Sequence, residues 1–195
     1  MNQLPIRASD PLGTQSARCG LMFLARRGGV LLISIILGAT QLVSANPFPL
    51  KGPTVPGRFA RLRHGVACAP EKAPLVVKRA IWAANQLTKR PYRYGGGHCS
   101  FYDSGYDCSG TISYALAGAG LLRVPLNSSD LLHYGKSGRG KWITVYARNG
   151  HAFAIIAGLR LDTTAWTNNY APDAPRWRTS GRPPRGFVKR HPVGL

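Results

Sequence analysis

Cys108 and His151 are of the types that carry out nucleophilic catalysis by a thiol, and their sequence surroundings favour that chemistry. Cys108 lies in YDCSG, residues 106–110, after a turn-forming stretch and at the start of a predicted helix. The dipole and free N–H groups of a helix N-terminus favour the thiolate, which is the attacking form. His151 opens a predicted strand directly after the turn pair Asn149-Gly150, from which its side chain can reach the helix end and act as the base.

Strand pairing predicts the group that orients this base. If residues 157 and 158 form a two-residue turn, Ile156 pairs with Leu159. Asp162 then lies on the same face as His151, one diagonal position away, where long side chains still meet. A turn longer by one residue would move Asp162 to the other face and make it a surface carboxylate.

Two helices and an antiparallel sheet must position these side chains. Apolar residues share one helical face in residues 73–87 and again in residues 108–119. β-rich runs follow, and they predict strands at residues 142–147, 151–157, 159–163 and 186–190. Helices followed by a strand meander indicate an α+β fold, because a parallel sheet requires strands and helices to alternate.

The composition indicates one globular domain with a strong positive charge. The 195 residues include 26 Lys and Arg against 7 Asp and Glu, for a formal net charge of +19, and 44% are hydrophobic. That apolar fraction excludes a disordered or collagen-like chain. The charge favours neutral or acidic partners, such as anionic polymers of the cell envelope.

An export signal is predicted at the N-terminus. The apolar run GVLLISIILGATQLVSA, residues 29–45, follows two arginines and ends in small residues before Asn46, as in a secretory signal peptide. A start at Met22 would give a leader of ordinary length, and an uncleaved membrane anchor is the alternative. We expect a secreted or periplasmic protein with a signal peptide at 1–45, a basic, proline-rich lead-in at 46–72 and a catalytic domain at 73–195.

Three cysteines follow the leader: Cys68, Cys99 and Cys108. Because exported proteins form disulfides, we predict a Cys68–Cys99 bond between the lead-in and the loop before the nucleophile. A Cys99–Cys108 bond, which would switch the enzyme off, is the alternative. No metal site is expected, because the chain has no CxxC or HxxxH spacing.

Together these motifs resemble the NlpC-type papain-like cysteine peptidases of the bacterial cell wall. In that family a PYxWGG-like segment precedes an Asp-Cys-Ser-Gly motif at a helix start, and a later strand opens with the base histidine. The corresponding segments of this chain are PYRYGGGH (residues 91–98), YDCSG and GHAFAIIAGLRLDT (residues 150–163). The resemblance covers most of the chain after Ala73 and implies a papain-like α+β fold, with the nucleophile helix packed on a small antiparallel sheet.

The resemblance also implies roles for single residues. Cys108 would be the nucleophile and His151 the base, whereas Asp162 stands where the family usually has His, Asn or Gln. A carboxylate also orients an imidazole and stabilises its charged form, so the logic of a triad is kept. Tyr92 matches the family's tyrosine ahead of the glycines, and its hydroxyl would join the Cys108 N–H in an oxyanion hole. An ordinary core aromatic is the alternative for Tyr92.

By this resemblance the protein would hydrolyse an amide bond in peptidoglycan stem peptides through a Cys108 thioester. We expect it to act as a monomer, without a cofactor or metal. The positive charge suits an anionic wall. The alternative is a cationic envelope-binding protein that kept the fold and lost turnover. No nucleic-acid partner is expected, because export separates the protein from nucleic acid and no readout motif occurs.

Overall fold

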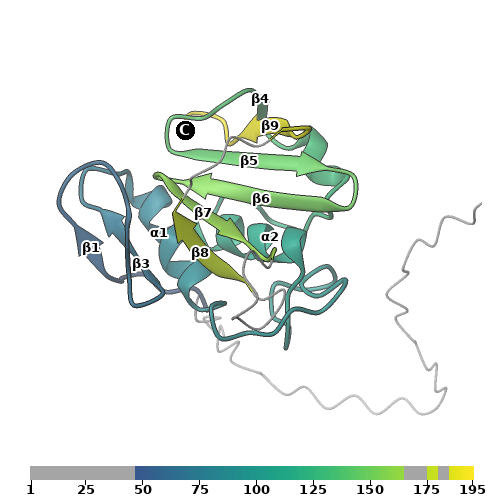
Figure 1. Ribbon diagram of the computed structural model, residues 1–195, viewed down its shortest axis with the longest axis horizontal. Coiled ribbons are helices and arrows are strands. Elements are labelled where there is room, and N and C mark those ends of the chain that lie inside the picture. The colour runs from purple at the N-terminus through teal and green to yellow at the C-terminus, as the bar shows by residue number, and fades with distance from the viewer. Residues whose placement is uncertain (1–46, 165–174, 180–184) are drawn as a thin grey trace, which may run out of the picture. The chain divides into compact units, whose positions relative to one another are not determined.

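The computed structural model describes residues 47–164, 175–179 and 185–195 (Figure 1). These residues belong to one compact unit, Val43–Leu195. The predicted signal peptide, residues 1–45, lies outside the described residues. Within them, neither helix combines the length and the apolar character that a membrane span needs.

Two helices precede the main sheet. Helix α1 spans Leu75–Asn85 and helix α2 spans Cys108–Gly118. Both predicted helices, at residues 73–87 and 108–119, are confirmed to within two residues at each end. Helix α2 is buried along its whole length, because it packs against α1 and also against the sheet.

Small side chains allow the two helices to approach closely. A Cβ atom added to Gly118 of α2 would collide with the side chain of Ala83 of α1. Ala83 is fully buried. The small-residue composition of α2 therefore sets the distance between the helices, and with it the place of the helix that begins at Cys108.

The main sheet has six strands in the order β4-β9-β5-β6-β7-β8, and all of its described neighbours are antiparallel. Helix α2 packs against β6 and β7 (Figure 1). The four predicted strands are confirmed as β5, β6, β7 and β9, with ends shifted by at most two residues. The elements after α2 are the 3₁₀ helix η1 (Asp130–His133), β4 (Lys136–Ser137), β5 (Ile143–Arg148), β6 (His151–Ile156), β7 (Leu159–Asp162), β8 (Arg176–Thr179) and β9 (Val188–His191).

The register between β6 and β7 is the one that the sequence predicts. Ile156 pairs with Leu159 across a two-residue turn, Ala157-Gly158. Both turn residues have positive φ, 48° and 93°, as a type I′ hairpin turn requires. The side chains of His151 and Asp162 therefore lie on the same face of the sheet.

The lead-in forms a small sheet of its own, which was not predicted from the sequence. Strands β1 (Thr54–Val55), β2 (Arg61–Arg63) and β3 (Val66–Pro70) are arranged in the order β1-β3-β2. Asn85, the last residue of α1, fixes β3: its amide accepts from the Ala67 N–H at 3.0 Å and donates to the Ala67 carbonyl at 2.9 Å. The prediction of an α+β fold, with the Cys108 helix on an antiparallel sheet, is confirmed.

Candidate active site

The N-terminus of α2 holds Cys108 as the first residue of the helix. Asp107 is the N-cap, and its Oδ1 accepts from the Gly110 N–H at 2.8 Å and from the Ser109 hydroxyl at 3.0 Å. The cap satisfies one of the free N–H groups of the first turn. Cys108 is 8% exposed, so the candidate nucleophile is a buried residue.

His151 faces this thiol from the first position of β6. Its partner across the β5–β6 hairpin is Arg148. The ring Nε2 lies 3.2 Å from Oδ1 of Asp162 and 3.0 Å from the Thr164 hydroxyl. The Cys108 side chain lies close enough to the ring to help raise the pKa of His151. The structure thus brings together the three residues that the sequence indicates as nucleophile, base and orienting group.

Asp162 is a buried carboxylate, not the surface group considered as the alternative. It is 1% exposed at the end of β7. Its Oδ1 accepts from the backbone N–H groups of Thr163 at 2.8 Å and Thr164 at 3.2 Å. Its Oδ2 accepts from Arg160, with Nε at 2.8 Å and Nη2 at 2.5 Å. These contacts fix the carboxylate beside the imidazole.

The electrostatics of the site favour a charged imidazole beside a charged carboxylate. Burial opposes protonation of His151, but hydrogen bonds and charge from Asp162 and Cys108 outweigh it and raise the pKa of His151 to about 9. Burial alone would raise the pKa of Asp162, yet the hydrogen bond from His151 and the charge of Arg160 hold that pKa below its ordinary value. At neutral pH the two groups therefore form an ion pair.

Tyr92 lies half-buried in the segment between α1 and the glycine-rich loop. Backbone hydrogen bonds join the residues on either side of it to Tyr106: the Tyr106 N–H donates to Pro91 at 3.0 Å, and the Arg93 N–H donates to Tyr106 at 3.4 Å. The segment is thus fixed to the residue two positions before Cys108. The role of Tyr92 in an oxyanion hole stays a prediction.

The predicted disulfide between Cys68 and Cys99 is not formed, and neither is the alternative with Cys108. Cys68 and Cys108 both carry free, buried thiols. The physical reason lies in the lead-in sheet: β3 holds Cys68 in the protein interior at 5% exposure, whereas Cys99 lies in an exposed stretch before α2.

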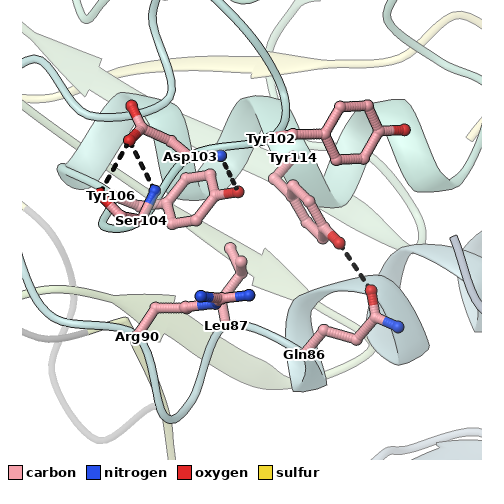
Figure 2. A pocket seen from close by; sticks show the side chains of 8 residues that line it. All are labelled: Gln86, Leu87, Arg90, Tyr102, Asp103, Ser104, Tyr106 and Tyr114. Atoms are coloured by element: carbon pink, nitrogen blue, oxygen red, sulfur yellow. Dashed lines mark hydrogen bonds between the residues drawn. The ribbon is translucent and has the colours of Figure 1, made fainter. Parts of the chain in front are cut away.

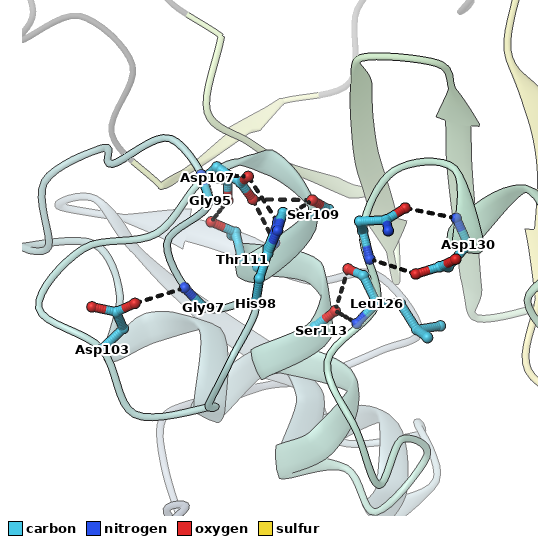
Figure 3. A network of polar contacts seen from close by, with 12 residues as sticks. Gly95, Gly97, His98, Asp103, Asp107, Ser109, Thr111, Ser113, Leu126 and Asp130 are labelled. Atoms are coloured by element: carbon cyan, nitrogen blue, oxygen red, sulfur yellow. Dashed lines mark hydrogen bonds and ion pairs between the residues drawn. The ribbon is translucent and has the colours of Figure 1, made fainter. Parts of the chain in front are cut away.

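A second histidine, His98, contacts the start of α2, and no role for it was predicted from the sequence. His98 Nε2 is 2.8 Å from Oδ2 of Asp107 and 3.0 Å from the Ser109 hydroxyl (Figure 3). Arg160, which contacts Asp162, was also missed. A usable signal existed for it, because a residue two positions before Asp162 shares its face on an extended chain.

A pocket with a volume of about 470 Å³ lies between the residues that follow α1, the loop before α2 and α2 itself. Figure 2 shows its aromatic wall and the side chain of Arg90 directed into it. Neither Cys108, His151 nor Asp162 is among its lining residues, which are Gln86, Leu87, Arg90, Tyr102, Asp103, Ser104, Tyr106 and Tyr114. The pocket is therefore separate from the thiol and the imidazole.

No family model matches this chain. No curated protein matches it either. Among solved structures, the chain is similar to the peptidoglycan hydrolase RipB from Mycobacterium tuberculosis, with 22% sequence identity and a TM-score of 0.47. That similarity covers 62% of this chain and 66% of the RipB chain, slightly less than two thirds of it.

Proposed function

We propose that this protein is an exported, papain-like cysteine peptidase that hydrolyses an amide bond in the stem peptides of peptidoglycan. The observation that carries the proposal is that Cys108, His151 and Asp162 lie close together at the N-terminus of α2. A nucleophile, a base beside it and a buried group that orients the base form the arrangement of a catalytic triad.

The first half of the reaction forms a thioester. The cycle starts with the Cys108 thiolate beside a protonated His151, and the thiolate attacks the carbonyl carbon of the scissile amide. The Cys108 N–H and the Tyr92 hydroxyl are the expected donors to the oxyanion. The protonated His151 then donates its proton to the leaving amine, the C–N bond breaks, and the acyl group remains on Cys108.

The second half releases the acyl group. His151, now neutral, takes a proton from water, and the hydroxide attacks the thioester carbonyl. The C–S bond breaks, the carboxylic acid leaves, and the Cys108 thiolate returns beside a protonated His151. Asp162 stabilises the imidazolium in both halves, which requires that it stay ionised; its ion pair with Arg160 supports that state.

The substrate class rests on the resemblance of PYRYGGGH, YDCSG and the GH-opened strand to the NlpC-type peptidases. The charge supports it, because the chain without residues 1–45 keeps 22 Lys and Arg against 6 Asp and Glu, a formal net charge of +16. An anionic wall attracts such a cationic enzyme and raises the local concentration of substrate. The neutral-to-acidic partners favoured by the charge include this polymer and its muropeptide fragments.

The test is a digest of purified muropeptides, with products identified by mass spectrometry. We expect a new amine and a new carboxylate at one amide bond with the wild-type protein, and no product with Cys108→Ala. Cys68→Ala is the matched control, because it removes another buried free thiol and should leave turnover intact. Absence of product with folded wild-type protein would contradict the proposal.

A cationic envelope-binding protein without turnover is the second candidate. It is favoured by the net charge and by an aspartate at the third position of the triad. The same digest separates the two, because a binding protein would be retained on insoluble peptidoglycan and release no fragments. The buried and charge-paired state of Asp162 supports the enzyme.

A further inference from the structure

His98 contacts the two residues that flank the nucleophile. Its Nε2 lies 2.8 Å from the carboxylate of Asp107 and 3.0 Å from the hydroxyl of Ser109 (Figure 3). The His98 side chain is 32% exposed, whereas that of Asp107 is 6% exposed. The proposed catalytic cycle, which uses His151, does not explain this second pair of histidine and aspartate.

The Asp107 side chain has two structural contacts at this position. Its Oδ1 caps α2 through the Gly110 N–H, and its Oδ2 accepts from the Gly95 N–H at 3.2 Å as well as from His98. The carboxylate thus joins the glycine-rich loop to the first turn of the helix. Without it, the N-terminus of α2 would lose both its cap and its contact with the loop.

The same carboxylate creates an electrostatic problem for catalysis. Asp107 directly precedes Cys108, and a nearby anion disfavours a second negative charge such as a thiolate. A cation paired with Asp107 reduces such repulsion. His98 is placed to be that cation, since its ring is in direct contact with Oδ2.

The charged groups around His98 favour its protonated form. The hydrogen bond to Asp107 raises the pKa of His98 against the opposing effect of burial, and the charges of Asp107 and of Asp130 on η1 act in the same direction. In return, the pKa of Asp107 is held below its ordinary value by the His98 hydrogen bond and the Gly110 N–H, although burial would raise it.

The backbone that carries His98 is fixed against α2. A Cβ on Gly110 would collide with the carbonyl oxygen of Gly96, and a Cβ on Gly97 would meet the ring of Tyr106. The Gly97 N–H also donates to Asp103 at 3.0 Å (Figure 3). The loop therefore presents His98 to Asp107 in a defined position.

We propose that His98 is a positioning residue for the nucleophile: as an imidazolium it neutralises Asp107 and holds the first turn of α2, so that the Cys108 thiolate is favoured. This inference rests on the proposed function in one respect, the assignment of Cys108 as the nucleophile. His98 itself neither attacks the substrate nor replaces His151 as the base.

The test is the pH dependence of iodoacetamide alkylation at Cys108, followed by mass spectrometry of the peptide that contains it. In His98→Gln, we expect the midpoint of the alkylation curve to rise by about one pH unit, which corresponds to about tenfold less thiolate on the rising part of the curve. His98→Lys restores a cation and should return the midpoint toward the wild-type value. His64→Gln, at an exposed histidine in the β2–β3 turn, is the matched control and should not move it.

A double-variant comparison isolates the role of Asp107. In an Asp107→Asn background the anion is gone, so His98→Gln should no longer shift the midpoint, whereas a purely structural His98 would affect both backgrounds equally. Melting temperatures of all variants show whether the fold is kept. An unchanged midpoint in folded His98→Gln, or an equal shift in both backgrounds, would overturn the inference.

The alkylation curve and the muropeptide digest test the two proposals independently. If the protein releases no fragments but the double-variant comparison gives the expected result, the proposed function fails and the inference about His98 holds. If muropeptides are cleaved and the midpoint in His98→Gln stays at the wild-type value, only the inference fails.

Discussion

Arg160 and Asp162 form a two-point ion pair in which both guanidinium contacts fall on one carboxylate oxygen: Nε at 2.8 Å and Nη2 at 2.5 Å from Oδ2. The other oxygen, Oδ1, is left to His151 at 3.2 Å. The guanidinium also lies 3.7 Å above the centroid of the Phe153 ring. Arg160 therefore fixes both the charge and the orientation of the group that supports the candidate base.

Replacing Asp162 should slow turnover, although the nucleophile Cys108 is still present. In Asp162→Ala the imidazole loses its orienting partner, and we expect kcat to fall by roughly 10²- to 10⁴-fold. Asp162→Asn should keep more activity, because its amide oxygen still accepts from the ring. Steady-state kinetics on a purified muropeptide measure both variants.

The matched control for this comparison is Glu71→Gln, at an exposed carboxylate in the turn before α1. It removes one negative charge at a distance from the three candidate residues and should leave kcat unchanged. If folded Asp162→Ala turned over substrate at the wild-type rate, Asp162 would have no catalytic function.

Arg160 is expected to act through Asp162. Arg160→Gln removes one of the two cationic partners of a buried carboxylate, and breaking a buried ion pair costs about 3 to 5 kcal/mol in the free energy of unfolding. Urea unfolding measures the loss, with Arg61→Gln on the exposed edge of β2 as the control. A loss no larger than that of the control would show that the ion pair does not stabilise the site.

The geometry of the hairpin could be predicted from the sequence because its constraints are local. The turn at Ala157-Gly158 sets the β6–β7 register, and a period of two then places Asp162 beside His151. The start of α2 was equally accessible, since turn residues precede Cys108 and a run of small and apolar residues follows it. Both features depend on residues adjacent in the chain.

The contacts that could not be predicted depend on loops. His98 reaches Asp107 through a glycine-rich segment without periodicity, so no pattern indicates which side chains it brings together. The Cys68–Cys99 prediction was wrong for a related reason: cysteine spacing carries no information on distance, and only the fold shows that Cys68 is held inside β3. The lead-in strands, two to five residues long, are too short to show alternation.

Gly110 should be required for the contact between the glycine-rich loop and α2. Helix propensity alone predicts that Gly110→Ala stabilises the protein by about 1 kcal/mol. The structure predicts the opposite sign, because the new Cβ would collide with the Gly96 carbonyl oxygen, and overpacking costs about 1 to 3 kcal/mol. Thermal unfolding decides the sign; a higher melting temperature in Gly110→Ala would mean that the loop is free to move away.

The mature protein is expected to begin near Asn46, because small residues occupy the positions three and one before that junction. N-terminal sequencing of protein recovered from the envelope or medium tests this expectation. Recovery of a chain that retains residues 29–45 would indicate a membrane anchor.

The pH dependence of turnover should follow the protonation of His151. The imidazolium must donate a proton to the leaving amine, and its pKa is raised to about 9. We therefore expect kcat/KM to fall as the pH rises through about 9, while alkylation of Cys108, which needs no proton donor, continues. In Asp162→Ala the alkaline fall should move to lower pH, because the carboxylate that holds the proton is absent.

The stability of the folded protein should also decrease as the pH rises. A histidine whose folded-state pKa exceeds its unfolded value of about 6.5 contributes stability that is fully present below pH 6.5 and is lost as the pH rises through about 9. The melting temperature of the wild-type protein should thus decrease between pH 6.5 and 9.5. His151→Gln is the reference, since its decrease over that range must be smaller. An equal decrease in both proteins would show that His151 holds no extra proton in the folded state, and the ion pair with Asp162 would then have to be abandoned.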